Sequence, residues 1–150
     1  MSYDSERAAI ETYFIAQWAG ATPVGMDGHK FQPVNNSVRL AIQSGQVLQG
    51  SVGRSANRKD HVGMLMATIY TDGGKGSSAW RGYAETIIGF LEEVTIDSAG
   101  AAITATGDAF VRFSPPGIVG PQHPYIQSTT QNIPFTITNV AAPFVRYEYR

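Results

Sequence analysis

The stretch GSVGRSANRKDHVGMLMATIYTDGGKGSSAW, residues 50–80, contains the elements that decide the fold. Its centre, His61 to Tyr70, is rich in apolar residues, and this composition predicts a central strand of a sheet. A glycine-rich turn follows at residues 72–76. A helix is then predicted from Ser78 to Glu93, because Trp80, Ala84, Ile87 and Leu91 recur at helical spacing. The stretch therefore predicts a strand, a tight turn and an amphipathic helix.

The polar segment before this strand, GRSANRKD at Gly53–Asp60, contains Arg54, Arg58 and Lys59 and almost no apolar residue. We predict an exposed flap between two strands. Hairpin loops usually have about two to five residues, so this segment is longer than a hairpin requires. Extra length in an exposed loop favours a role in contacting a partner.

Further strands and one more helix are predicted on either side of this stretch. Residues 4–19 form a helix with an aromatic stripe at three-to-four spacing. The expected strands cover residues 37–43, 47–52, 101–106, 109–114, 133–138 and 144–150. The predicted order is one helix, three strands, a second helix and then three or four strands. This order indicates an α+β domain spanning residues 1–150. We expect a mostly antiparallel sheet with two helices packed on one face.

The strand, glycine turn and helix resemble the layout of a phosphate-binding loop, so this possibility is tested first. The pattern Gly-x-x-x-x-Gly-Lys-Ser/Thr places its second glycine and lysine at Gly74 and Lys75. Its first glycine position is then Ile69, and its hydroxyl position is Gly76. Neither residue matches the pattern. The alternative to a phosphate-binding loop is a tight turn in which glycines adopt unusual backbone angles. A small enzyme or ligand-binding domain that uses this turn remains an alternative, and nucleotide binding lost in Lys75→Ala is its test.

Composition and motif spacing argue against several other classes of function. The 150 residues carry a net charge of −1, which argues against a general nucleic-acid binder. The absence of cysteine excludes disulfides and thiol chemistry. No run approaches the ~18 apolar residues of a membrane span, so we expect a soluble cytoplasmic product. His29, His61 and His123 lack metal-site spacing, and for His29, which is near Asp27 in sequence, we expect a surface position. We therefore predict no cofactor, no metal, no catalytic residues and no enzymatic activity.

The order of features resembles the tail terminator proteins of long-tailed bacteriophages, and related proteins of prophages and gene transfer agents. The matching features are an N-terminal helix, Phe31-Gln32-Pro33 before the strand VRLAIQSG, and the flap GSVGRSANRKD. They continue with the strand GMLMATIYTD, the turn GGKG, the helix AWRGYAETIIGFLEE and a late aromatic strand, FVRYEYR. The resemblance is one of pattern and order and covers most of the chain. It is weakest from about residue 100 to 130.

The resemblance implies a structural virion protein of a siphophage-like tail. Such subunits form a homohexameric ring on the head-proximal end of the tail tube, at the tail–neck junction. The ring stops tube polymerisation and presents a surface to the head-completion or stopper protein. DNA passes through its lumen without specific binding, and no membrane is involved. Assembly takes place in the host cytoplasm. The low charged fraction, 15%, suits surfaces that neighbouring subunits cover.

Within that role, the residues expected at the subunit or tube interface are Arg54, Arg58, Lys59 and Lys75. The loop from Pro115 to Pro124 is a second candidate contact. The alternative is another neck or tail component, namely a head–tail connector, a stopper or a tail tube subunit. Such proteins also form rings and need no catalytic residues. A tube subunit polymerises into long cylinders, whereas a terminator does not.

Overall fold

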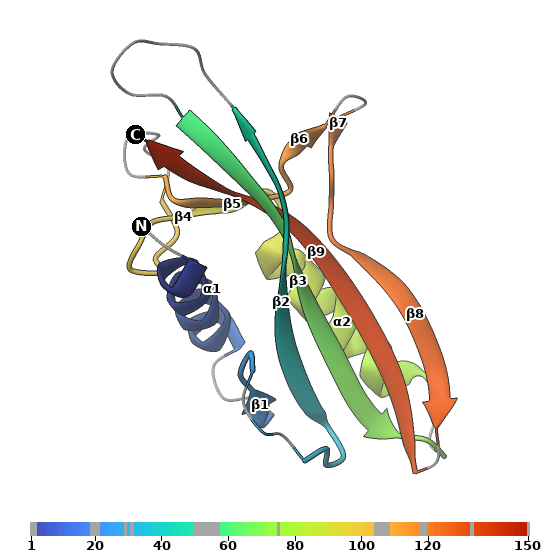
Figure 1. Ribbon diagram of the computed structural model, residues 1–150. Helices are drawn as coiled ribbons and strands as arrows, with labels where there is room; N and C mark the ends of the chain where they lie inside the picture. Colours follow the sequence, from blue (N-terminus) through green and yellow to red (C-terminus); the bar gives the residue numbers. More distant parts are fainter. Residues whose placement is uncertain are drawn as a thin grey trace.

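The structure is a computed structural model that describes residues 3–18, 22–28, 30, 32–49, 58–74, 76–103, 109–117, 120–132 and 134–149. Its main feature is a curled seven-stranded sheet with two helices, α1 (Tyr3–Trp18) and α2 (Ser78–Leu91), as Figure 1 shows. The predicted α+β class and mostly antiparallel sheet are confirmed. Only the pairing of β1 with β2 is parallel among the described strands.

Seven strands form the large sheet and two more form a small hairpin. The large sheet runs in the order β1-β2-β3-β9-β5-β4, and β8 pairs with the remaining part of β9. The strands of this sheet are β1 (Val24–Gly25), β2 (Ser37–Gln49), β3 (Arg58–Asp72), β4 (Thr95–Ile96), β5 (Val111–Phe113), β8 (Tyr125–Asn132) and β9 (Phe135–Tyr149). The separate hairpin joins β6 (Pro116–Gly117) to β7 (Gly120–Pro121).

Both helices cover the same face of the sheet and contact each other through aromatic rings. The Phe14 and Phe90 rings meet edge to face with centroids 5.2 Å apart, and Trp18 lies 5.7 Å from Tyr83. The predicted stripes of both helices are buried, and they share one core with alternate residues of β2, β3 and β9. The residues of β3 between these, such as Met66, are partly buried and belong to the opposite face, which neither α1 nor α2 covers (Figure 1).

The longest strands are longer than the sequence predicted. The expected strands at 37–43 and 47–52 form a single strand, β2, with a bulge between Ser44 and Val47. The expected strands at 133–138 and 144–150 also belong to one strand, β9. Pro143 explains the second error, because proline cannot donate to a sheet ladder and argues against a central strand. Pro143 lies between the part of β9 that pairs with β8 and the part that pairs with β5.

Strand β8 was not predicted at all. Its sequence, YIQSTTQN, contains one aromatic and one aliphatic residue, and all eight residues are exposed. A strand at the edge of a sheet with both faces open gives no hydrophobic alternation to detect. The expected strand at 101–106 was also wrong in its described part, because only Ala102 forms an isolated bridge, with Ile96.

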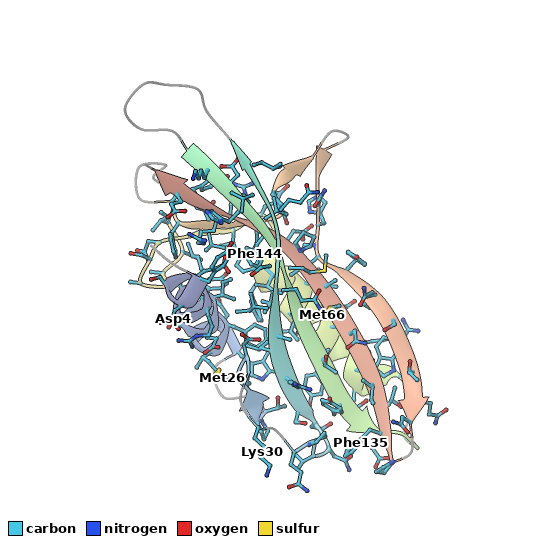
Figure 2. The ribbon with its side chains drawn as sticks, in the orientation of Figure 1. Asp4, Met26, Lys30, Met66, Phe135 and Phe144 are labelled. Carbon is cyan, nitrogen blue, oxygen red and sulfur yellow. The ribbon has the colours of Figure 1, made fainter. Side chains whose placement is uncertain are left out.

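One glycine in β3 is required by packing. A Cβ on Gly63 would lie 2.5 Å from the Phe144 ring and 2.8 Å from the Gln43 carbonyl oxygen. Phe144 is fully buried midway along the sheet (Figure 2). The Phe144 ring crosses β3 in the space that a side chain at position 63 would occupy. Glycine at this position therefore lets the sheet curl around the ring.

Candidate functional site

Among the predicted interface residues, Lys59 is the one whose side chain the structure describes. Lys59 is at the first end of β3, where this strand pairs with Gln49 of β2 and Glu148 of β9. The glycine turn begins at Asp72, at the other end of β3. A 15-residue strand at a rise of ~3.3 Å per residue separates these ends by roughly 46 Å. Lys59 and the start of the glycine turn therefore lie far apart on the sheet.

The hairpin of β2 and β3 exposes apolar side chains beside a cation. Val47 is 47% exposed and Leu48 is 52% exposed, and Lys59 on the partner strand is exposed too. The flap was predicted to span Gly53–Asp60. In the structure, residues 58–60 belong to β3 and pair with both neighbouring strands, so the expected flap is shorter at its second end. We call Val47, Leu48 and Lys59 the hairpin arm.

The other predicted interface residues are only partly covered by the structure. Arg54 and Lys75 lie outside the described residues. For Arg58 the backbone is described, opposite Tyr149, and the side chain is not. In the second candidate loop, Pro116–Gly117 pairs with Gly120–Pro121, and the Gln122 amide donates to the Pro115 carbonyl at 3.0 Å. This loop is thus organised as a short hairpin.

The glycine turn is tied to the neighbouring hairpin by hydrogen bonds. Asp72 Oδ1 accepts from the Gly74 amide at 2.9 Å, and Gly76 has a φ of +76°. The Gly73 amide donates to the Pro134 carbonyl at 3.0 Å, and Gln131 Nε2 donates to the Gly73 carbonyl at 2.6 Å. These contacts connect the end of β3 to the turn between β8 and β9. They give the glycines a backbone role that needs no phosphate.

A buried cluster of charged residues lies beneath the hairpin arm. Arg146 Nε lies 3.1 Å from Glu6 Oε1, although 140 positions separate them in sequence. His61 Nε2 lies 2.6 Å from Glu148 Oε2, and Arg146 is directly opposite His61 on the neighbouring strand. Tyr3 covers the cluster, since its ring meets that of His61 at 5.6 Å and the Arg146 guanidinium at 5.1 Å.

One of the three histidines, His61, is buried in this cluster, whereas the predicted surface position concerned His29. His61 is only 9% exposed, whereas His123 is exposed beside Glu92 at 3.1 Å and His29 lies outside the described residues. No local sequence pattern indicates the cluster, because its members come from α1, β3 and β9. A buried arginine is stable only when it is paired, so the unusual burial of Arg146 (1% exposed) is what reveals the cluster.

Burial governs the protonation of one carboxylate in this cluster. Desolvation raises the pKa of Glu6 above its ordinary value, and the hydrogen bond and charge of Arg146 oppose that rise. Two carboxylates and one guanidinium therefore share a space with little water. Their arrangement fixes the start of α1 against the ends of β3 and β9, directly below the hairpin arm.

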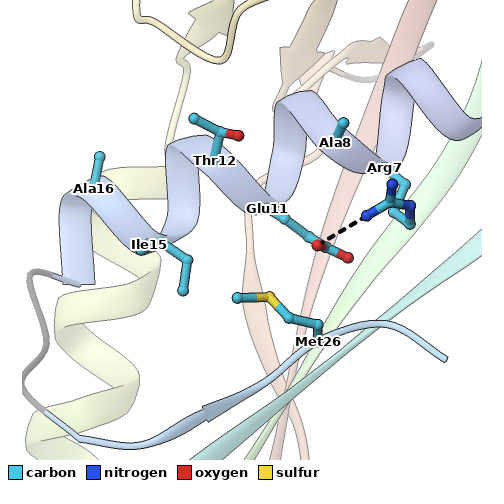
Figure 3. A pocket seen from close by; sticks show the side chains of 7 residues that line it. All are labelled: Arg7, Ala8, Glu11, Thr12, Ile15, Ala16 and Met26. Carbon is cyan, nitrogen blue, oxygen red and sulfur yellow. Dashed lines mark hydrogen bonds and ion pairs between the residues drawn. The ribbon is translucent and has the colours of Figure 1, made fainter. Parts of the chain in front are cut away.

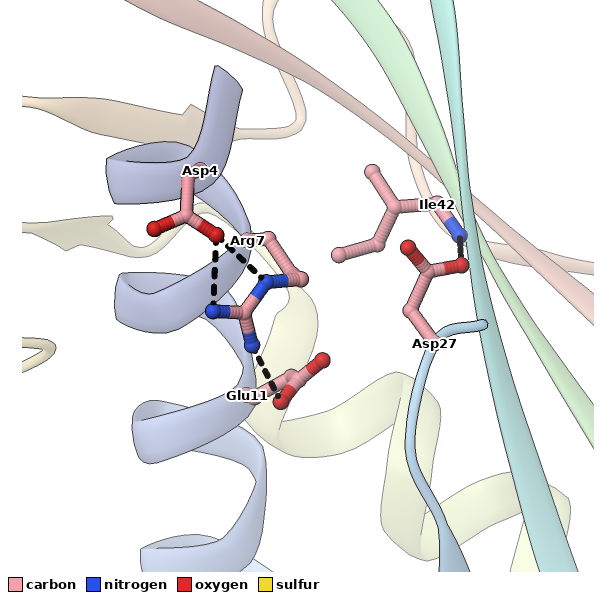
Figure 4. Close-up of polar contacts among 5 residues, drawn as sticks. All are labelled: Asp4, Arg7, Glu11, Asp27 and Ile42. Atoms are coloured by element: carbon pink, nitrogen blue, oxygen red, sulfur yellow. Dashed lines mark hydrogen bonds and ion pairs between the residues drawn. The ribbon is translucent and has the colours of Figure 1, made fainter. Parts of the chain in front are cut away.

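An open groove runs along the outer side of α1. It has a volume of about 490 Å³ and lies between the helix and the segment after β1 (Figure 3). Its lining residues are Arg7, Ala8, Glu11, Thr12, Ile15, Ala16 and Met26. Arg7 bonds Asp4 at 2.9 Å and Glu11 at 3.1 Å, and Asp27 accepts from the Ile42 amide at 3.0 Å (Figure 4).

Within the described part of the chain, no group of three or more histidine, aspartate or glutamate residues is placed to hold a metal ion. No described helix is long and apolar enough to cross a membrane. Asp97 Oδ1 accepts from the amides of Ala99 and Ala101 at 2.9 and 3.0 Å. That aspartate therefore organises a loop.

The comparisons with known proteins give a fold and no family. No family model matches the chain, and no curated protein matches it. One solved structure is similar over 100% of this chain and 99% of its own, with a TM-score of 0.66 and 19% sequence identity. The name of that protein states no function. A similarity at this identity supports the α+β fold over the whole chain.

Proposed function

We propose that this chain is a tail terminator subunit. In this role it forms a ring on the head-proximal end of a tail tube, stops tube growth and joins the tail to head-completion proteins. The proposal begins from the resemblance in the order of sequence features. The observation that carries it furthest is the hairpin arm, which exposes Val47 and Leu48 beside Lys59 at one end of β3.

The physical requirements of a ring agree with this arm. A closed ring of identical subunits joins two different surfaces of each subunit, so one surface must reach its neighbour. Apolar side chains beside a cation suit such a contact, because interface cores are poor in charge while rim charges orient the partner. The buried cluster below the arm anchors α1 at this end of the sheet.

The proposal is tested by reversing charge in the flap. The double variant Arg54→Glu, Arg58→Glu is expected to fold normally and to lose capping of growing tail tubes in electron micrographs. A matched control is Lys30→Glu with Arg39→Glu, which reverses two exposed cations outside the flap. The control is expected to cap tubes. Normal capping by the flap variant would remove the flap from the proposed interface.

One observation favours the alternative of a tube subunit. All eight residues of β8 are exposed and uncharged, and the described structure pairs this strand only with β9. An unprotected edge of this kind is a template for pairing with another chain. The purified protein alone distinguishes the two roles, because a tube subunit grows into long cylinders and a terminator stops at rings.

A further inference from the structure

We propose that the groove beside α1 binds the hairpin arm of a second copy of this chain. In this contact Val47 packs on Ile15, and Lys59 approaches the carboxylate of Glu11. The inference rests on the ring proposed above and names the two surfaces that join its subunits. It is carried by the groove, by an unpartnered buried carboxylate oxygen, and by the match in charge between groove and arm.

The groove has an apolar floor that no part of the described chain covers. Ile15 is 38% exposed on the outer side of α1, beside Ala16 and Met26. An exposed isoleucine alone is ordinary on a protein surface. Here it lines a concave space of about 490 Å³, which an apolar side chain from outside can enter.

Glu11 supplies the polar feature that points to a ligand. It is 8% exposed, and its Oε2 atom accepts from Arg7 at 3.1 Å. Its Oε1 atom is buried and has no hydrogen-bond partner among the described residues. Leaving a buried carboxylate oxygen without a donor is unfavourable. A donor brought by another chain would remove that cost.

The charges around the groove favour a cationic partner. Three carboxylates, those of Asp4, Glu11 and Asp27, lie on or beside it, and Arg7 is the cation among them (Figure 4). Four groups with three negative charges and one positive charge leave an excess of two negative charges. Lys59 of the hairpin arm has the complementary sign.

Strand register places the two recognition residues on one side of the arm. Val47 is opposite His61, and Gln49 is opposite Lys59, so Val47 and Lys59 share the face that His61 turns toward α1. Leu48 is opposite Asp60 and therefore points to the other face. Leu48 is as exposed and as apolar as Val47, which makes it a matched control.

The arm cannot fill the groove of its own subunit. Val47 is opposite His61, and His61 contacts Tyr3 at the start of α1. Ile15 lies twelve residues further along the helix, which is roughly 18 Å at a rise of ~1.5 Å per residue. A contact between Val47 and Ile15 must therefore join two copies.

Engineered cysteines provide the test, because the chain has no cysteine of its own. The variant Ile15→Cys, Val47→Cys is oxidised in the assembled protein, both alone and with growing tail tubes. A disulfide needs Cβ atoms about 3.5–4.5 Å apart, so a short bis-maleimide is used in parallel. We expect a ladder of covalent oligomers that ends at the ring size. The control Ile15→Cys, Leu48→Cys is expected to give several-fold less product.

The outcomes separate this inference from the proposed function. Rings that cap tubes without preferential Val47 crosslinking would overturn the inference and leave the terminator role in place. A protein that remains monomeric with and without tubes would overturn both. In the crosslinking variant, adding Lys59→Glu is expected to lower the yield about tenfold, the effect of one close interfacial charge pair. An unchanged yield would contradict the Lys59–Glu11 contact.

Discussion

The two ends of β3 are built in opposite ways. At the end near Asp72, short backbone and side-chain hydrogen bonds connect the glycine turn to the β8–β9 hairpin. At the end near Lys59, apolar side chains are exposed above a buried cluster of charges. The first end is completed by the chain itself. The second end presents groups that a neighbour would cover, which is why we place the interface there.

The largest expected effect concerns Arg146, which supports the interface end. Arg146→Met leaves the buried carboxylate of Glu6 without its cation and removes the guanidinium that lies 3.9 Å from Glu148. Removing one partner of a buried ion pair costs about 3–5 kcal/mol of unfolding free energy. Chemical denaturation measures this loss. The double variant Glu6→Gln, Arg146→Met is expected to recover part of it, and a loss below about 1 kcal/mol in the single variant would contradict a structural role for the cluster.

A smaller effect is expected at the glycine-turn end. Gly76 has a φ of +76°, so Gly76→Ala places a side chain in a backbone conformation that it disfavours. We expect a loss of about 1 kcal/mol in unfolding free energy and normal capping of tubes. Gly74→Ala is the control, because the nearest described atom beyond its chain neighbours, Asp72 Oδ1, lies 3.6 Å from the new Cβ and Gly74 is not among the described residues with positive φ. Loss of capping in a folded Gly76→Ala protein would give the turn a role in assembly.

The pH dependence of stability sharpens the description of the buried cluster. Burial raises the pKa of Glu6 in the folded protein above its ordinary value of 4.5. Its stabilising contribution is therefore fully present below that value and is lost as pH rises through the folded-state pKa. Glu6→Gln removes this titration, so its unfolding free energy should improve relative to the natural protein as pH rises. If the unfolding free energy of Glu6→Gln instead fell relative to the natural protein as pH rises, the interaction of Glu6 with Arg146 would outweigh the desolvation of Glu6.

The smallest effect on stability is expected in the hairpin arm. Val47 is about half exposed, so Val47→Asp removes little buried area and should change unfolding free energy by less than about 0.5 kcal/mol. The same variant should lose ring formation, which size-exclusion chromatography with light scattering measures. Leu48→Asp on the opposite face is the control and should retain more assembly. If the Val47→Asp and Leu48→Asp variants assembled equally well, the result would contradict the proposal that the Val47 side of the hairpin arm contacts the neighbouring subunit.

The helices and the central strand could be predicted because their patterns are local. The aromatic stripe of α1 and the apolar stripe of α2 repeat at helical spacing, and both are buried as expected. From His61 to Asp72, strand β3 alternates between buried and partly buried residues. Strand β9 was divided wrongly at Pro143, whose position between two pairing partners is set by tertiary structure.

The candidate site could be predicted only in part. The polar flap drew attention to Lys59, and the glycine turn predicted at residues 72–76 forms hydrogen bonds through Asp72 and Gly73. The groove and the buried cluster had no sequence signal. Glu6 and Arg146 are 140 positions apart, and the groove brings Glu11 of α1 together with Met26, which lies outside that helix.

The central claim is that the chain caps a tail tube, and electron microscopy of the purified protein with its cognate growing tubes tests it most directly. We predict rings seated at one end of each tube and tubes that no longer lengthen. Tubes that continue to grow without rings at either end would contradict the proposed function.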